Sequence, residues 1–398
     1  MSTAADSERV ADLARQVVAD HNPKSVPIPD YLGACYDAGL SWVHFPEGQG
    51  GLGVSRGLQA VADGILQGAG GPVPLGLNPM GYGMAAPTIR EHAQSDDLKK
   101  SWLRPLATTE DIWCQLFSEP GAGSDLAGLA TSAVPDGDEW VINGQKVWTS
   151  LAHRARWGLL LARTNPDVPK HKGLTYFVVD MHGPGVETRP LRQLTGQAEF
   201  NEVYFTDARI PDEHRLGAVG NGWAVAMTTL MNERSALGGS GSRRGAGTIS
   251  DAVGLWASRP DLHTPVLRDR LTQLWLRSEA QRLTSERSRA SAGVGGPGPE
   301  GSIGKLVGAE LNQHIYQWCM DLLGPEGVLY HNYNLLDEAD SEADWRGPIQ
   351  QRFLRSRANT IEGGTSDVMR NILGERVLGL PGDLRADAGM PWKEIPRG

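Results

Sequence analysis

Leu116-Phe-Ser-Glu-Pro-Gly-Ala-Gly-Ser-Asp125, followed by Asn143-Gly-Gln-Lys-Val-Trp-Thr-Ser150, is the part of this chain that decides its fold. The first stretch combines a Pro-Gly turn, glycines without a Cβ atom and a terminal Ser-Asp pair. Such a loop brings backbone N–H groups and a hydroxyl close to a phosphate or a polar ring edge. In the second stretch, Asn143-Gly144 predicts a hairpin turn, and Trp148-Thr-Ser150 brings an indole and two hydroxyls to one place. This combination suits a planar heterocycle such as a flavin, although a glycine-rich turn beside a core tryptophan is also consistent with it.

The composition is that of an ordinary soluble globular protein. A chain of 398 residues is too long for one simple core, so we expect two or three domains. Hydrophobic residues make up 40% and charged residues 21%, and the formal charge is −9. This balance offers no basic field for nucleic acid or for an anionic membrane. No run approaches the roughly 18 apolar residues that span a bilayer, so we expect no membrane insertion.

Cysteine usage and the first residues indicate the compartment. Cys35, Cys114 and Cys319 are widely separated and show neither the spacing of a metal site nor that of a disulfide framework. The polar start of the chain, residues 1–9, lacks the apolar core of a signal peptide. We therefore expect a cytoplasmic protein without a bound metal.

The order of elements along the chain is helices, then strands, then helices. Val10, Leu13 and Val17 recur at helical spacing near the start, and a long apolar stripe of bundle type runs over residues 303–322. Between these regions lie short segments rich in Val, Leu, Ile and aromatic residues, at residues 113–117, 139–142, 157–163, 174–179 and 202–205. Their spacing predicts a small β-sandwich or barrel, and hence an α+β fold.

Four motifs make the chain resemble the acyl-CoA dehydrogenase flavoprotein family over roughly residues 5–385. They are Ser118–Asp125, Asn143–Ser150, Thr360-Ile-Glu-Gly-Gly-Thr-Ser-Asp367 and the closing segment Arg370–Pro381. The resemblance implies an N-terminal helical domain over residues 1–110, a middle β-barrel or sandwich domain over residues 111–221, and a C-terminal four-helix bundle over residues 222–398. The chain is similar to actinobacterial members of the family, including subunits of heteromeric steroid-type enzymes.

The resemblance also implies a reaction. Members of the family hold FAD, remove a proton from the α-carbon of an acyl-CoA thioester with a carboxylate base, and transfer a hydride from the β-carbon to flavin N5. The product is a trans-2-enoyl-CoA, and an electron-transfer flavoprotein is the expected acceptor. Three alternatives stay open: an acyl-CoA oxidase, a flavin monooxygenase on the same fold, and a non-catalytic partner subunit.

Two carboxylates compete for the role of base. Many members carry the base directly before the Gly-Thr-Ser of the C-terminal motif, but here that position is Gly363, and Glu362 is displaced by one residue. A shift of one residue turns a side chain in another direction. Other members place the base on an earlier helix just before an arginine, a pattern that Glu233 and Arg234 match. We expect Glu233 to be the catalytic base, and we keep Glu362 as the alternative.

Further site residues follow from the resemblance. It places Arg234 and Ser124 at substrate positions. It gives flavin positions in the loop and the hairpin, and positions for the adenosine-ribose side in the C-terminal motif, namely Leu116, Ser118, Gly123, Ser124, Trp148, Ser150, Thr365 and Asp367. The Thr365-Ser-Asp367 run also fits a helix N-cap, and a capped helix start favours phosphate as well.

The chain departs from the family where the far end of FAD is held. Many members have Arg-x-x-Phe-Gly, which reaches the FAD of a neighbouring subunit, whereas Ser258–Pro265 has no Phe-Gly and predicts a loop. Asp321 stands where an amide is common, and its charge would repel a phosphate. We therefore expect a homo- or hetero-oligomer, and a homologous partner subunit would supply the missing contacts.

Overall fold

The computed structural model describes residues 4–237, 243–291, 299, 301–330, 347–384 and 387–396. For residues 233–237 and 289–291 it describes the helical backbone alone. The chain divides into two compact units. The first consists of residues 1–189, 200–232 and 387–398, and the second consists of residues 190–199 and 233–386. The three-domain division with boundaries after residues 110 and 221 stays a prediction.

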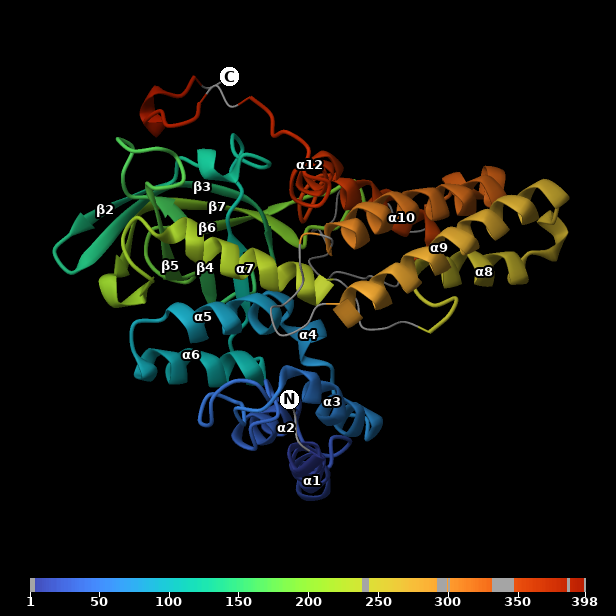
Figure 1. Cartoon of the computed structure of the whole chain (residues 1–398), viewed down its shortest axis with the longest axis horizontal. Coiled ribbons are helices and arrows are strands. Elements are labelled where there is room, and N and C mark those ends of the chain that lie inside the picture. Colours follow the sequence, from blue (N-terminus) through green and yellow to red (C-terminus); the bar gives the residue numbers. More distant parts are fainter. Residues whose placement is uncertain are drawn as a thin grey trace. The chain divides into compact units, whose positions relative to one another are not determined.

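The first unit begins with helices and continues into strands (Figure 1). Its helices are α1 (Ala4–Asp20), α2 (Ile28–Asp37), α3 (Gln59–Gly68), α4 (Pro74–Leu77), α5 (Ala86–His92), α6 (Asp96–Thr108) and the first part of α7 (Gly222–Leu237). Its strands are β1 (Trp113–Leu116), β2 (Ser132–Asp136), β3 (Glu139–Ser150), β4 (Trp157–Arg163), β5 (Leu174–Asp180), β6 (Val186–Leu191), β7 (Phe200–Pro211) and β8 (Arg215–Leu216). The last residues of β6 fall within the second unit.

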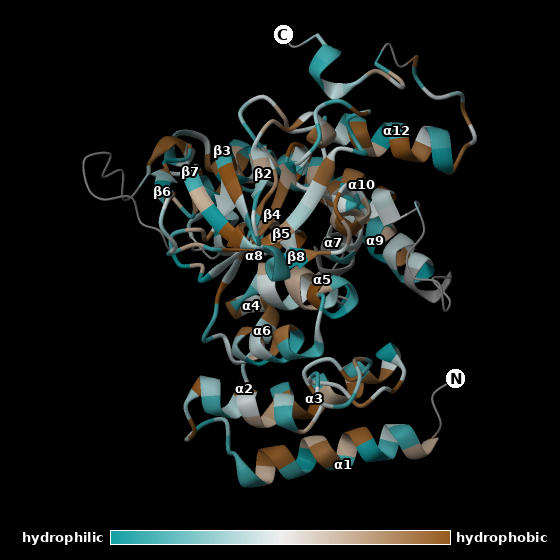
Figure 2. Cartoon of the chain, turned by 90° about the vertical axis from the view of Figure 1, so that its left-hand side faces the viewer, coloured by the Kyte–Doolittle hydropathy of each residue, from teal (hydrophilic) through white to brown (hydrophobic). Residues whose placement is uncertain are grey.

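All of these strands join one sheet, in the order β6-β7-β3-β2-β4-β5-β8, and β1 pairs with β4 in parallel. β4 and β5 are neighbours near one end of this order, and almost every residue in them is apolar, as expected for strands that are covered on both faces. In β4, Leu159 and Leu161 face one apolar cluster, with residues of α5, α6 and α7, while Leu160 and Ala162 face a second cluster on the other side of the sheet. Figure 2 shows apolar residues on the strands and an apolar stripe along α1, which packs with α2 and α3 into a third cluster.

Asn143-Gly144 does not form the predicted hairpin turn. β3 passes through it without interruption, and the turn into β3 from β2 lies at Gly137, with a φ of 66°. Opposite Asn143, β7 bulges at Asp207, which has a φ of 49° and exchanges hydrogen bonds of 2.9 and 3.0 Å with the Asn143 side chain. A Cβ atom on Gly144 would lie 2.5 Å from Thr131 Oγ1. The prediction was wrong because an Asn-Gly pair can equally serve a bulge and a close approach of two strands.

The second unit is mainly helical. It contains α8 (Thr248–Ser258), α9 (Pro265–Ser291), α10 (Gly301–Leu323), α11 (Ile349–Ser356) and α12 (Ser366–Arg376). The apolar stripe predicted for residues 303–322 lies on α10, where Leu311, Ile315 and Trp318 are buried against α8 and α9. The α+β class, with helical N- and C-terminal regions around a middle sheet, is thus confirmed. The predicted loop between residues 291 and 301 lies mostly outside the described residues.

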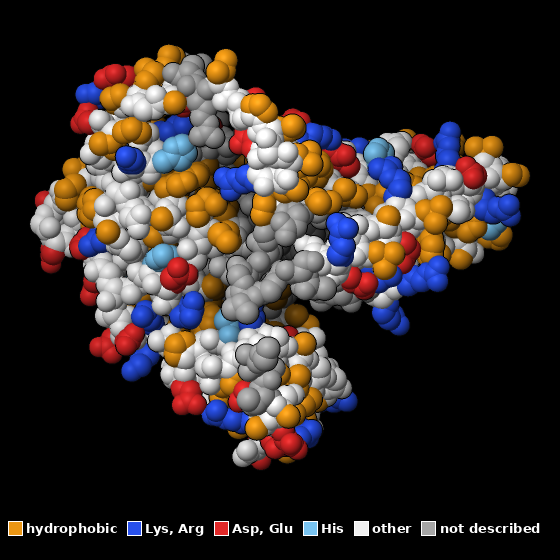
Figure 3. All heavy atoms as spheres, in the orientation of Figure 1, with side chains coloured by type: hydrophobic (Ala, Val, Ile, Leu, Met, Phe, Trp, Pro, Cys, Tyr) orange, Lys and Arg blue, Asp and Glu red, His pale blue; other side chains and the backbone are white. Residues whose placement is uncertain are grey.

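Charges are mixed over the surface. On the face shown in Figure 3, Lys and Arg side chains lie among Asp and Glu side chains. Within the described part of the chain, no helix is long and apolar enough to cross a membrane.

Candidate functional site

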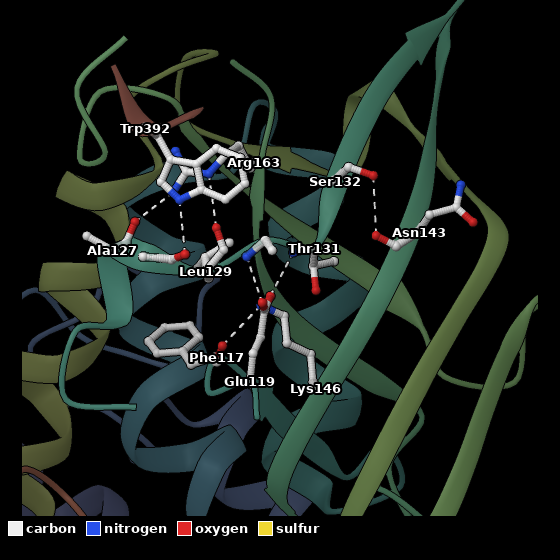
Figure 4. A network of polar contacts seen from close by, with 12 residues as sticks. Phe117, Glu119, Ala127, Leu129, Thr131, Ser132, Asn143, Lys146, Arg163 and Trp392 are labelled. Atoms are coloured by element: carbon white, nitrogen blue, oxygen red, sulfur yellow. Dashed lines mark hydrogen bonds and ion pairs between the residues drawn. The ribbon is translucent and has the colours of Figure 1, made fainter. Parts of the chain in front are cut away.

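A buried ion pair holds the glycine-rich loop, which contains Ser118–Asp125 (Figure 4). Lys146 of β3 has no exposed side-chain surface, and its Nζ donates to Glu119 Oε1 at 2.8 Å and to the Phe117 carbonyl at 3.0 Å. The Glu119 carboxylate also accepts from the backbone N–H groups of Ala130 (2.6 Å) and Thr131 (2.9 Å). The pair therefore joins both ends of the loop to the centre of the sheet.

Burial and pairing act in opposite directions on these two groups. Burial lowers the pKa of the Lys146 ammonium to about 8, because it penalises the charged form more than Glu119 favours it. Burial alone would raise the pKa of the Glu119 carboxyl. The Lys146 charge and the hydrogen bonds outweigh that effect and lower the pKa instead. The attraction to Glu119 thus offsets part of the burial cost of the Lys146 ammonium, and this buried pair holds the loop.

The top of the loop is open. The backbone N–H groups of Gly123 and Ser124 and the Ser124 hydroxyl donate to no other residue in the part of the chain that the structure describes. No heavy atom lies within 4 Å of the position that a Cβ atom would take on Gly121 or Gly123. Unused N–H groups with open space before them can receive a phosphate oxygen or a polar ring edge. Gly123 and Ser124 thus fit their predicted role.

Trp148 is presented by a strained segment of β3. The strand bulges between Lys146 and Thr149 in its pairing with β7, and Trp148 adopts a left-handed φ of 60°. Its side chain is 57% exposed. A left-handed conformation is costly for a large side chain, and such strain gathers at functional sites. An exposed indole held at this cost fits a contact with a flat ligand.

The residues around Trp148 face in different directions. Ser150 is half-buried, whereas Thr149 is fully buried, and its Oγ1 has no hydrogen-bond partner among the described residues. The expectation that both hydroxyls share one place with the indole is therefore wrong for Thr149, because the bulge turns Trp148 outward and leaves Thr149 inside.

The two predicted residues at the start of the loop differ in exposure. Ser118 is half-buried, its carbonyl accepts from the Val147 N–H at 2.9 Å, and its hydroxyl has no partner among the described residues. Leu116 is fully buried in the apolar cluster beneath the sheet. Any contact that Leu116 makes with a ligand must come from its backbone.

In the second unit, Glu362 is already held by other side chains. Arg355 binds its carboxylate with two hydrogen bonds of 3.0 and 2.8 Å, and Asn359 donates to it at 2.9 Å. A general base needs a free lone pair aimed at the proton that it removes. These three contacts use most of the acceptor sites of the Glu362 carboxylate and fix its orientation toward Arg355, which favours Glu233 as the base. The side chains of Glu233 and Arg234 lie outside the described residues, on the last turns of α7.

Thr365 caps α12, as its residue type predicts. Its hydroxyl accepts from the Val368 N–H at 3.1 Å, while Asp367 in the first turn is 91% exposed. The Ser366 Oγ is buried without a partner in the described part of the chain. The cap and a ligand role for Thr365 and Asp367 are compatible, because a helix start attracts phosphate.

In the segment that departs from the family motif, Ser258–Pro265, the arginine is engaged in ion pairs. The loop between α8 and α9 carries Arg259, whose guanidinium binds Asp261 (3.0 Å) and Glu326 (2.6 Å). Asp321, at the end of α10, accepts from Gln317 at 3.0 Å. Two carboxylates thus neutralise the arginine that could otherwise bind phosphate in this segment.

Sequence reasoning missed the residues that support the loop. The period-2 pattern of β3 places Lys146 on the same side as the buried Trp140 and Ile142, so a charged residue at an inward position was the available signal. Arg163 ends the apolar strand β4 on the face of Leu161. Trp392, which packs on Arg163, had no local signal because it lies far away in sequence.

Comparison with known proteins gives consistent matches. Residues 114–208 match the model for "Acyl-CoA dehydrogenase, middle domain", and residues 220–378 match the model for "Acyl-CoA dehydrogenase, C-terminal domain". The acyl-CoA dehydrogenase IpdE1 of Mycobacterium tuberculosis is 39% identical over 86% of this chain and 86% of its own length. The acyl-CoA dehydrogenase FadE34 of the same organism is 43% identical over 75% of this chain, but the match covers 39% of FadE34. The ChsE4-ChsE5 complex of M. tuberculosis superposes with a TM-score of 0.70 at 26% identity, over 96% of this chain and 99% of the matched one.

Proposed function

The chain belongs to the acyl-CoA dehydrogenase family of oxidoreductases, and from this premise we propose that it binds FAD and oxidises an acyl-CoA thioester to the trans-2-enoyl-CoA. One observation carries the proposal. An exposed, strained Trp148 accompanies a loop whose N–H groups at Gly123 and Ser124 have no partner among the described residues. A flat, hydrogen-bonding cofactor satisfies both features at once.

The residues of this chain divide the work between holding and proton transfer. Gly123, Ser124 and Ser118 offer donors, Trp148 offers an aromatic face, and Thr365 and Asp367 lie at the start of α12, where a phosphate is favoured. Glu233 removes the α-proton, and Arg234 helps to position the substrate. A bound FAD would supply the hydride acceptor for the β-carbon. Glu362 keeps its place in the Arg355 pair and takes no proton from the substrate.

An anaerobic titration of the purified protein tests the proposal. We expect one member of a panel of fatty, branched and polycyclic acyl-CoA compounds to bleach the flavin absorption. Loss of a general base lowers the rate about 10²–10⁴-fold, so Glu233→Gln should slow bleaching to that extent. Glu362→Gln is the matched control and should bleach at nearly the normal rate. Equal rates for wild type and Glu233→Gln would show that the base is elsewhere. Absence of flavin both from the protein alone and from its complexes with homologous chains would refute the proposal itself.

Oxygen and an electron acceptor separate the reaction classes. A dehydrogenase reduced by substrate should pass electrons to an electron-transfer flavoprotein and react slowly with oxygen. Rapid formation of peroxide would indicate an oxidase instead, and insertion of oxygen into the substrate would indicate a monooxygenase.

We also propose that a homologous subunit completes the site at the distant end of FAD. The two carboxylates on Arg259 engage the arginine that could otherwise bind a pyrophosphate, and Asp321 adds a negative charge that Arg270 approaches only to 3.9 Å. Co-expression with homologous chains should raise the flavin content of the purified complex. A homotetramer with FAD at full occupancy would contradict this assembly.

A further inference from the structure

The last described residues return to the first unit and pair with a loop that follows β4. The Trp392 N–H donates to the Val168 carbonyl at 2.9 Å and the Lys393 N–H donates to the Pro166 carbonyl at 3.1 Å, beside a bridge between Pro169 and Pro391. We call residues 387–396 the C-terminal strap. The strap is far in sequence from the glycine-rich loop, but it lies directly against the end of that loop (Figure 4).

One end of the strap binds the loop through Trp392 and Arg163. The guanidinium of Arg163, which is 3% exposed, donates to the carbonyls of Ala127 (2.6 Å) and Leu129 (3.0 Å). The Trp392 ring covers this guanidinium at 4.2 Å, and its Nε1 donates to the Gly128 carbonyl at 3.0 Å. Three consecutive carbonyl groups, which follow Gly123 and Ser124 closely, are thus fixed by one cation and one indole.

The other end of the strap binds the loop through Lys170. Its Nζ lies 2.9 Å from Asp125 Oδ2 and 2.5 Å from Asp387 Oδ2, and its side chain is mostly buried. Asp125 directly follows Ser124. Along the chain, the open N–H groups of Gly123 and Ser124 therefore lie between two fixed points. Glu119 precedes them, and Asp125 and the carbonyl groups of residues 127–129, which the strap helps to hold, follow them.

We propose that the C-terminal strap positions the cofactor loop, with Trp392 and Arg163 as positioning residues. The strap holds the carbonyl groups of residues 127–129, so that the preceding N–H groups are preorganised to receive the ligand. The proposal rests on the proposed function, because it takes FAD as the ligand of this loop. It requires no contact between the strap and the cofactor.

FAD release from the full-length holoenzyme tests the proposal. After dilution, the fluorescence of released FAD reports the dissociation rate. We expect Trp392→Ala to release FAD about tenfold faster, which corresponds to about 1.4 kcal/mol. Trp392→Phe keeps the ring over Arg163 but loses the bond to the Gly128 carbonyl, so it should fall between wild type and Trp392→Ala. Lys393→Ala is the matched control on the same strap, because it removes an exposed ion pair with Asp167 and should release FAD at the normal rate.

The readouts separate positioning from general stability. A positioning role predicts that the absorption band of bound flavin shifts in Trp392→Ala, whereas a purely structural role predicts a lower melting temperature with an unchanged band and release rate. That second pattern would overturn the proposal. If Trp392→Ala does not fold, Trp392→Phe and Asp387→Asn must show the faster release, and normal release from both would equally overturn it. A wild-type protein that never holds FAD would instead refute the proposed function.

Discussion

Replacement of Lys146 by methionine is the most direct test of how the glycine-rich loop is held. Methionine keeps most of the volume of the side chain but removes the ammonium group. The Glu119 carboxylate would then stay buried with two backbone N–H donors and no cation. The Phe117 carbonyl would also lose its donor.

The expected loss follows from burial. Removing one partner of a buried pair costs about 3–5 kcal/mol, because the remaining charge is left uncompensated. A domain of this size loses about 2–4 °C of melting temperature per kcal/mol, so Lys146→Met should lower the melting temperature by about 6–20 °C. Glu119→Gln combined with Lys146→Met should recover part of this loss, because the two changes share one interaction.

Thermal and urea unfolding of the purified variants measures the effect. Lys393→Met is the matched control: its pair with Asp167 is as short, at 2.6 Å, but both side chains are more than half exposed. An exposed pair of this kind contributes about 0–1 kcal/mol, so the control should change little. A loss below about 1 kcal/mol for Lys146→Met would refute the reasoning, since it would place the buried pair in the range of surface pairs.

Three further changes test other parts of the first unit. Burial, together with nearby arginines, lowers the pKa of His44 from 6.5 to about 4, so the unfolded chain takes up a proton first as the pH falls. The free energy of unfolding should therefore fall by about 1–2 kcal/mol, after a discount for solvent screening, as the pH is lowered from 6.5 to about 4. His44→Asn should reduce this pH dependence, measured by urea unfolding. Gly144→Ala should cost about 2 kcal/mol or more by the same assay, because the added Cβ would lie 2.5 Å from Thr131 Oγ1; a neutral effect would contradict the close packing. Trp148→Gly should be about 1 kcal/mol more stable than Trp148→Ala, because both lose the indole and only alanine keeps the left-handed strain, and FAD should dissociate faster from both; a less stable glycine variant would contradict the strain.

The two most apolar strands of the sheet could be predicted because their signal is local. β4 and β5 are continuous apolar runs bounded by polar residues, and the structure places β4 at residues 157–163, as predicted. β3 extends well beyond the predicted residues 139–142, because Asn143-Gly144 was taken as a turn. A pair of residues that suits a turn cannot reveal the bulge of another strand, which depends on Asp207 more than sixty positions away.

The candidate site divides in the same way. The types and order of Gly123, Ser124 and Trp148 indicated a ligand loop and an aromatic contact. The supports of that loop come from β3, from the end of β4 and from the C-terminal strap. Sequence spacing marks Lys146 as an inward charge, but it does not identify the residues that Lys146, Arg163 and Trp392 contact. Glu362 shows that a motif alone does not reveal whether a side chain is available. The motif resembles a site, but Arg355 and Asn359 donate hydrogen bonds to the Glu362 carboxylate.

The charges beneath the loop show how it can favour a phosphate without a basic surface. Three cations, on Lys146, Arg163 and Lys170, lie among three carboxylates, on Glu119, Asp125 and Asp387, so this network has no net charge. Each cation is bound to a carboxylate or to carbonyl oxygens and is not directed at the open top. Attraction for an anion must then come from the oriented N–H groups at Gly123 and Ser124, whose dipoles act over short range. Under the proposed function, such a loop would select its ligand by fit, which is consistent with a chain whose overall charge is negative.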